Sequence, residues 1–186
     1  NDVEEMVGSV LHYGLGGDCQ MMLAMQDPDN YKAVLDNMSD TDKATFKKEA
    51  DNVERFIALS DKQQGDLYRG ISFNSDYSDK KAMKSTLDAL KEGKEISMGH
   101  IASWSTERGI AADYADGALN AEFGSGEDYS IVYHVGSNKS AVSLRGINPQ
   151  GECISSKDAK YKVNSVNYQY DDDYECHRYF VELEEI

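Results

Sequence analysis

Three short segments of the chain carry side chains that could act together on one substrate. In chain order they are residues 67–71 (Leu-Tyr-Arg-Gly-Ile), residues 103–106 (Ser-Trp-Ser-Thr) and residues 150–152 (Gln-Gly-Glu). Each has the character of a strand end, and each contributes a different polar group. Together they offer an arginine for phosphate oxygens, serine hydroxyls for a sugar, and a carboxylate that can stabilise a developing positive charge.

Arg69 is the candidate phosphate ligand of the first segment. It lies in a strand-like run after Leu67 and Tyr68, where a buried charge is costly unless it is paired. A guanidinium is a planar fork that can hold two pyrophosphate oxygens, and a surface ion pair is the alternative. Gly70 has no side chain, so a ligand could approach its N–H and C=O closely. Tyr-Arg-Gly by itself does not decide between these interpretations.

Ser103 and Ser105 are the candidate sugar ligands of the second segment. They alternate along one strand, so their side chains face one side and Trp104 faces the other. Two hydroxyls on one face suit a ribose, although exposed serines at a strand end need no function. The alanine-containing run 107–115 predicts a helix directly after this strand.

Glu152 is the candidate catalytic carboxylate of the third segment. It opens the strand that we expect after Gln150 and Gly151. A carboxylate at the edge of a sheet can be an ordinary surface group. Beside a ribose, an ionised Glu stabilises the oxocarbenium ion that forms when the bond to the anomeric carbon breaks.

In this order, the three segments and the helix after the second resemble the NAD-binding core of the mono-ADP-ribosyltransferases of the arginine–serine–glutamate class. The resemblance covers residues 66 to 183, and it implies NAD as substrate, no metal, and transfer of ADP-ribose to a protein of a host cell. The implied catalytic residues are Glu152, Gln150 and Ser103. The implied NAD-binding residues are Arg69 for the diphosphate, Gly70 for the nicotinamide amide, Ser103 for the ribose, Ser105, which also supports its strand, and Phe123, which stacks on nicotinamide or anchors its loop.

Gln150 departs from the arginine-modifying members of this family, including its phage enzymes, which usually carry Glu there. Members with Gln modify asparagine or glutamine side chains, and a few modify guanine. A carboxylate can activate an arginine acceptor, whereas a carboxamide can hold another carboxamide. The resemblance therefore implies an Asn or Gln acceptor, with Arg as the alternative, and the acidic charge of the chain argues against guanine.

Two other functions stay open at this point. The chain can be an NAD glycohydrolase, in which water is the acceptor, or a non-catalytic domain of a larger phage particle protein. Because the family includes phage enzymes and bacterial toxins, we expect the site of action to be the cytoplasm of a host or target cell. The enzyme would be made there or delivered as part of a secreted or virion protein.

The composition limits the other classes of function. The chain has 186 residues and a formal net charge of −15, from 34 Asp and Glu against 19 Lys and Arg. Such a surface repels phosphate backbones, so no duplex nucleic acid is expected as a partner. The apolar runs are a few residues long, whereas a spanning helix needs about 20, so no membrane is expected either. Three widely spaced cysteines without a C-x-x-C pair make a disulfide framework or zinc site improbable.

Apolar spacing and the resemblance together predict a single ADP-ribosyltransferase-like domain of the α+β class. Residues 1–64 read as an N-terminal helical lobe, and residues 65–186 as an NAD-binding β core of many short strands. We expect the lobe to pack on a mostly antiparallel split β-sandwich. Asp171–Asp173 lack the spacing of a calcium loop and are expected at a hairpin tip. The expected strands are 67–73, 96–98, 101–105, 130–135, 141–144, 152–154, 161–166 and 179–183.

Overall fold

The chain divides into two compact units. The structure, a computed structural model, describes residues 1–17, 19–73, 80–116, 129–148 and 151–186. The first unit comprises Asn1–Gln63, Ser97–Ser103 and Ser140–Ala159, and the second comprises Gln64–Ile96, Trp104–Lys139 and Lys160–Ile186. Residues 97–103 and 140–159 thus belong to the same unit as the N-terminal helices.

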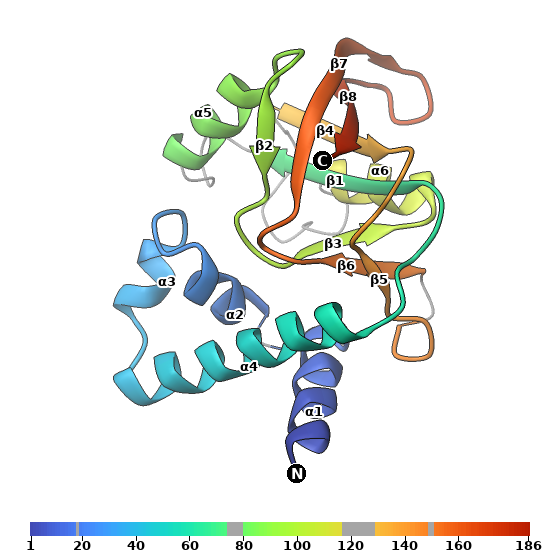
Figure 1. The fold of residues 1–186 in the computed structure, drawn as a ribbon. Helices are drawn as coiled ribbons and strands as arrows, with labels where there is room; N and C mark the ends of the chain where they lie inside the picture. The colour runs from blue at the N-terminus through green and yellow to red at the C-terminus, as the bar shows by residue number, and fades with distance from the viewer. Residues whose placement is uncertain (18, 74–79, 117–128, 149–150) are drawn as a thin grey trace. The chain divides into compact units, whose positions relative to one another are not determined.

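Four helices form the N-terminal part of the first unit (Figure 1, blue to teal). They are α1 (Asp2–Gly14), α2 (Cys19–Gln26), α3 (Lys32–Asp36) and α4 (Asp40–Leu59). Asn1 caps α1, because its side-chain oxygen accepts from the N–H groups of Val3 and Glu4 at 3.0 and 3.1 Å. Ser39 caps α4 by accepting from the N–H of Asp42 at 3.1 Å. Local sequence therefore fixes where both long helices begin.

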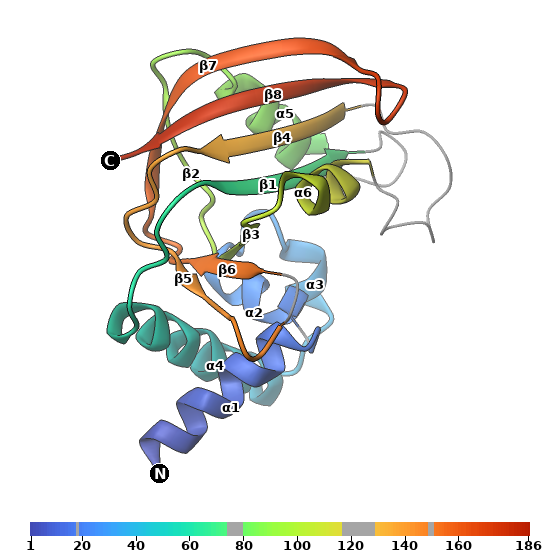
Figure 2. The ribbon, with the colours of Figure 1, turned by 90° about the vertical axis from the view of Figure 1, so that its right-hand side faces the viewer.

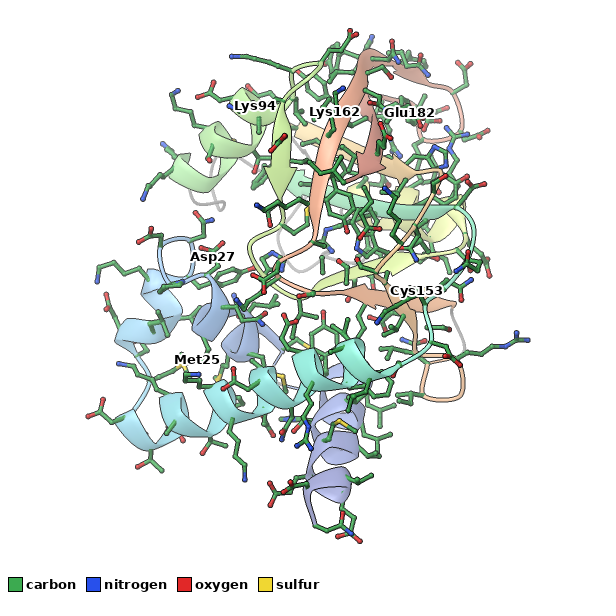
Figure 3. The ribbon with its side chains drawn as sticks, viewed as in Figure 1. Met25, Asp27, Lys94, Cys153, Lys162 and Glu182 are labelled. Carbon is green, nitrogen blue, oxygen red and sulfur yellow. The ribbon has the colours of Figure 1, made fainter. Side chains whose placement is uncertain are left out.

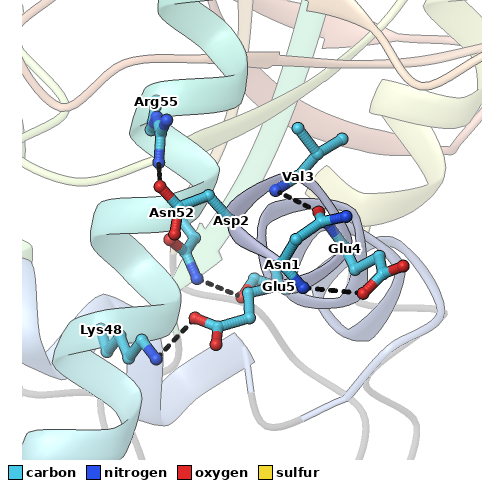
Figure 4. A network of polar contacts seen from close by, with 9 residues as sticks. Asn1, Asp2, Val3, Glu4, Glu5, Lys48, Asn52 and Arg55 are labelled. Carbon is cyan, nitrogen blue, oxygen red and sulfur yellow. Dashed lines mark hydrogen bonds and ion pairs between the residues drawn. The ribbon is translucent and has the colours of Figure 1, made fainter.

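Polar contacts join α1 to α4 (Figure 4). Lys48 Nζ lies 2.6 Å from Glu5 Oε2, and Asn52 Nδ2 donates to Ser9 Oγ at 3.1 Å. An exposed ion pair contributes at most about 1 kcal/mol to stability. Two contacts at successive turns nevertheless favour one rotation of α1 about its axis, and so one direction for Tyr13 near its C-terminal end.

An apolar core holds the helices against strands of the same unit. Strand β5 (Val142–Ser143) pairs antiparallel with β6 (Glu152–Ser155), with Val142 opposite Ile154. Glu152 therefore begins a strand that the helices cover. The buried residues of this core are Val10, Tyr13, Met22, Ala50, Val53, Ile57, Ile101, Val142, Leu144 and Ile154.

A sheet forms the centre of the second unit (Figure 2). Arg69 on strand β1 (Leu67–Phe73) lies opposite Tyr133 on strand β4 (Tyr129–Val135) in an antiparallel pair, and β4 runs parallel to strand β8 (Cys176–Glu185). Strand β3 (Ala102–Ser105) begins in the first unit, ends in the second, and places Ser105 opposite Tyr68 of β1. The neighbouring strands are, in order, β7 (Lys160–Asp171), β8 (Cys176–Glu185), β4 (Tyr129–Val135) and β1 (Leu67–Phe73), with β2 (Glu95–Ser97) beside β7.

Helix α6 (Arg108–Ala115) packs directly on β1. Its buried side chains are small alanines, which allow a close approach. A Cβ atom at Gly70 would lie 1.6 Å from the carbonyl oxygen of Ala111, so only glycine fits at this point of the strand. The second unit also contains helix α5 (Lys80–Ala89).

Strands β7 and β8 form a hairpin that is longer than the sequence predicted. The expected strands, 161–166 and 179–183, continue into a polar stretch without apolar alternation. Aromatic contacts across the strands support this stretch: the ring of Tyr168 lies 4.6 Å from that of Tyr179 and 5.5 Å from that of His177. Such cross-strand pairs contribute about 0.2–1 kcal/mol each. Asp171 pairs with Cys176, so the prediction of a hairpin tip at residues 171–173 is confirmed.

The fold class is confirmed as α+β. The described residues contain eight strands in a mixed, mostly antiparallel arrangement, together with the N-terminal helices and the helix after β3 that the sequence predicted. In the part of the chain that the structure describes, no helix is long and apolar enough to span a membrane.

Candidate active site

Glu152 is half-buried at the first position of β6 in the first unit. Gly151 before it adopts a positive φ of 67°, a conformation that glycine reaches without strain. The carbonyl of Glu152 accepts from the N–H of Leu144 at 2.8 Å, which fixes the backbone of the strand end. Asn148 Nδ2 donates to the carboxylate oxygen Oε2 at 2.8 Å. The backbone and one side chain thus direct this carboxylate.

Ser103 and Tyr13 extend this arrangement. The Ser103 hydroxyl hydrogen-bonds the Glu152 carboxylate, and Tyr13 Oη lies 2.9 Å from Ser103 Oγ. These three residues and Asn148, all in the first unit, are called the carboxylate cluster below. Tyr13 is 5% exposed and comes from α1, 90 residues before its partner.

Two opposing effects act on the charge of Glu152. Burial raises the pKa of the carboxyl group and is the larger effect, while the hydrogen bonds from Ser103 and Asn148 lower it. The neighbouring Cys153 is buried in β6 (labelled in Figure 3), and burial together with the Glu152 charge raises the pKa of its thiol to about 11. The thiol is therefore neutral at physiological pH, and the carboxylate is the acidic group of this strand end.

Arg69 lies in the middle of β1 in the second unit, half-buried, with Tyr133 opposite it on β4. Burial raises the pKa of Tyr133 to about 12, an effect that the positive charge of Arg69 reduces. The phenol thus stays protonated and does not neutralise the guanidinium. A charged fork on a central strand can bind a diphosphate, as the sequence indicated.

Gly70 and Ser105 have packing partners within the second unit. The space beside the α carbon of Gly70 is filled by the carbonyl of Ala111, so helix packing already requires glycine here. Ser105 is 5% exposed, and its Oγ accepts from the N–H of Glu107 at 2.9 Å at the start of α6. The contact between α6 and β1 therefore explains the glycine at position 70, a structural reason that the sequence interpretation of Gly70 did not include. Ser105 supports the backbone at the start of α6.

No family model matches the sequence, and the search of curated proteins finds no match. Solved structures do match. One match is the Vis toxin, an ADP-ribosyltransferase from Vibrio splendidus, in a structure with a bound inhibitor. It aligns with a TM-score of 0.71 and 14% sequence identity, over 98% of this chain and 72% of the toxin chain. An ADP-ribosyltransferase from Clostridium botulinum aligns with a TM-score of 0.60 at 11% identity, over 97% and 86%. Exoenzyme S from Pseudomonas aeruginosa, bound to carba-NAD and human 14-3-3 protein beta, aligns with a TM-score of 0.57 at 15% identity, over 96% and 72%.

The chain has the ADP-ribosyltransferase fold. The resemblance that the three segments indicated is confirmed at the level of the fold, across nearly the whole chain. These structural alignments establish the ADP-ribosyltransferase fold. At sequence identities this low, the reaction has to be argued from the site itself.

Within this fold, two predicted site residues cannot be placed. Gln150 and Phe123 lie outside the described residues. The described residues contain no group of three or more His, Cys, Asp or Glu side chains that could hold a metal ion. Of the remaining predicted residues, Ser103 and Glu152 are brought together in the first unit, and Arg69, Gly70 and Ser105 lie in the second.

Sequence reasoning missed two members of the carboxylate cluster. Tyr13 follows Val10 in a helical apolar pattern, which is typical of a core residue and gives no sign of a contact 90 residues away. Asn148 precedes Pro149 and reads as a turn residue. Its distance of four residues from Glu152 was the available signal, since a turn of that length can bring the two side chains together.

Proposed function

We propose that the protein is an NAD-dependent mono-ADP-ribosyltransferase that transfers ADP-ribose to a side chain of a host-cell protein and releases nicotinamide. The observation that carries this proposal is the carboxylate cluster in an ADP-ribosyltransferase fold. Glu152 is held by donors from Ser103 and Asn148, and is partly shielded from water. A fixed, partly desolvated carboxylate is the group that stabilises a ribosyl cation most effectively.

The reaction begins with binding of NAD. From the resemblance of their segments, Arg69 is the residue that we assign to the diphosphate, and Ser103 is the residue that we assign to the ribose next to nicotinamide. Contacts to the remote half of NAD hold the ribose in place, so their binding energy can favour distortion at the reacting bond. Glu152 accepts a hydrogen bond from a hydroxyl of the same ribose.

The bond between the anomeric carbon and the nicotinamide nitrogen then breaks. Nicotinamide leaves as a neutral molecule with the electron pair of that bond, and the ribose becomes an oxocarbenium ion that the Glu152 charge stabilises. A side-chain nitrogen of the target attacks the anomeric carbon and loses its proton to base or solvent. The products are nicotinamide, a proton and the ADP-ribosylated protein.

The acceptor that we propose is an Asn or Gln side chain, with Arg as the alternative. Gln150, two residues before Glu152, supports this choice because a carboxamide can pair with another carboxamide through both its donor and its acceptor. Gln150→Ala should abolish protein labelling and leave most NAD hydrolysis. Equal loss of both activities would place Gln150 in NAD binding and remove the basis for a carboxamide acceptor.

Incubation of a target-cell lysate with isotopically labelled NAD tests the proposal. Mass spectrometry should find the label on a side chain of a protein, and the Glu152→Gln variant should leave the lysate unlabelled. Free ADP-ribose without labelled protein would instead support an NAD glycohydrolase. If neither product forms and nicotinamide is never released, the chain is a non-catalytic domain.

A further inference from the structure

The Glu152 carboxylate is held by a chain of polar side chains that begins in helix α1. Tyr13 Oη lies 2.9 Å from Ser103 Oγ, Ser103 hydrogen-bonds Glu152, and Asn148 Nδ2 lies 2.8 Å from Glu152 Oε2. Tyr13 is almost fully buried, so its hydroxyl is positioned by packing and not by solvent.

The direction of these hydrogen bonds follows from their chemistry. An ionised carboxylate can only accept, so Ser103 must use its single proton on Glu152. The Ser103 oxygen therefore accepts the hydrogen bond from Tyr13, which donates its hydroxyl proton. Asn148 donates through its amide nitrogen, so both side-chain contacts to Glu152 favour the charged form.

Packing couples α1 to the turn that carries Asn148. A Cβ atom at Gly14 would lie 2.9 Å from Ile147 Cγ2 and 3.3 Å from Leu144 Cδ1, so the end of α1 touches this turn closely. The N–H groups of Ile147 and Asn148 both donate to the Leu144 carbonyl, at 2.9 and 3.0 Å. Tyr13 and Asn148 are thus parts of one packed arrangement around Glu152.

We propose that Tyr13 and Asn148 are positioning residues that fix the orientation of the Glu152 carboxylate, which makes helix α1 a part of the active site. This inference rests on the proposed function for its kinetic consequence. The inference also predicts a result that can be measured without enzymatic activity. Removing the side-chain group of Tyr13 or Asn148 weakens the hydrogen bonding that counteracts burial, so the pKa of Glu152 should rise. Among the described residues that interact with Glu152, the Cys153 thiol is also titratable, and its high pKa keeps it neutral.

The test compares Tyr13→Phe and Asn148→Ala with two matched controls, Tyr31→Phe and Asn37→Ala. Tyr31 packs edge-on against His100, and Asn37 bonds the backbone of α3. In protein labelled with ¹³C at the Glu carboxyl carbon, Glu152→Gln identifies the Glu152 signal, whose titration gives its pKa. Both cluster variants should show a raised pKa, and both controls the wild-type value.

Kinetics provide the second measurement. Asn148→Ala should lower kcat for NAD cleavage about 10- to 100-fold, because it removes a hydrogen bond to a charged group. Tyr13→Phe should lower kcat about 3- to 10-fold, because it acts through Ser103. KM for NAD should change little, and the acidic limb of the kcat profile should move to higher pH.

Three outcomes separate the possibilities. A raised Glu152 pKa with lower kcat supports the positioning role. An unchanged Glu152 pKa in both cluster variants, with only a lower melting temperature, would overturn it and leave Tyr13 and Asn148 as structural residues. If the cluster variants raise the Glu152 pKa but the wild-type protein never cleaves NAD, the positioning of Glu152 is supported and the proposed function is rejected.

Discussion

At the scale of single residues, the half-buried charge of Glu152 lowers the stability of the folded protein. Burial raises the pKa of its carboxyl group even though Ser103 and Asn148 donate to it. The folded protein therefore binds this proton more tightly than the unfolded chain. The stability that comes with the raised pKa is fully present at pH values below the pKa of Glu152 in the unfolded chain. It is lost as the pH rises through the pKa of Glu152 in the folded protein. At neutral pH the charge that the proposed reaction needs destabilises the fold.

Glu152→Gln should therefore stabilise the protein at neutral pH, by about 0.5–2 kcal/mol, because it keeps the shape and removes the charge. The gain should shrink as the pH falls from 8 toward the ordinary pKa of a glutamate. Thermal unfolding of both proteins across this range measures the difference. A constant difference at every pH, or a less stable variant at pH 8, would contradict the direction of the pKa shift.

Ser103 and Ser105 should respond differently to the same substitution. Ser103→Ala removes a hydrogen bond to a charged group, so turnover should fall about 10- to 100-fold. Ser105→Ala removes the acceptor for the N–H of Glu107 at the start of α6, so it should cost about 0.5–2 kcal/mol of stability with little change in turnover. Nicotinamide release and thermal unfolding are measured for both variants. The reverse pattern would show that the ribose is held by Ser105.

At the scale of secondary-structure elements, the contact between α6 and β1 decides how Arg69 is presented. Gly70 follows Arg69 on the strand, and the helix backbone touches it. Beside Gly109, near the start of α6, the described residues outside the helix backbone place no atom within 4 Å of where a Cβ would lie. The two glycines thus offer a matched pair, one required by packing and one not.

Gly70→Ala should destabilise the protein by about 1–3 kcal/mol or more, because the helix must move away from the strand. Gly109→Ala should be neutral or stabilise it by up to about 1 kcal/mol, because alanine favours a helix. Denaturant unfolding of both variants measures the difference. Equal effects at the two positions would mean that α6 does not approach β1 as closely as the structure shows.

Much of the element order follows from local sequence, and the exceptions have physical causes. The β1 strand and the α6 helix were expected where they occur, because apolar spacing and alanine content mark them. The hairpin of β7 and β8 was underestimated because cross-strand aromatic contacts of Tyr168 replace an apolar alternation. Such contacts depend on the partner strand and are invisible in one strand's own pattern.

At the scale of the whole molecule, the site residues that the sequence predicted come from segments far apart in the chain. Ser103 and Glu152 were identified because their motifs occur in a recognisable order. Tyr13 was not, because its contact with Ser103 spans 90 residues and depends on how α1 packs. The three-segment pattern was therefore enough to indicate the ADP-ribosyltransferase fold, whereas the residues that orient the carboxylate needed the tertiary structure.

The most direct test of the whole account is nicotinamide release from NAD by the wild type and by Glu152→Gln, with NAD affinity measured by calorimetry on the same samples. The account predicts that the variant binds NAD within about threefold of the wild type, because the charge acts mainly on the transition state. Nicotinamide release should fall by about 10³-fold or more. A variant that releases nicotinamide at the wild-type rate would contradict the central role of Glu152, and a wild type that binds NAD without releasing nicotinamide would contradict the proposed reaction.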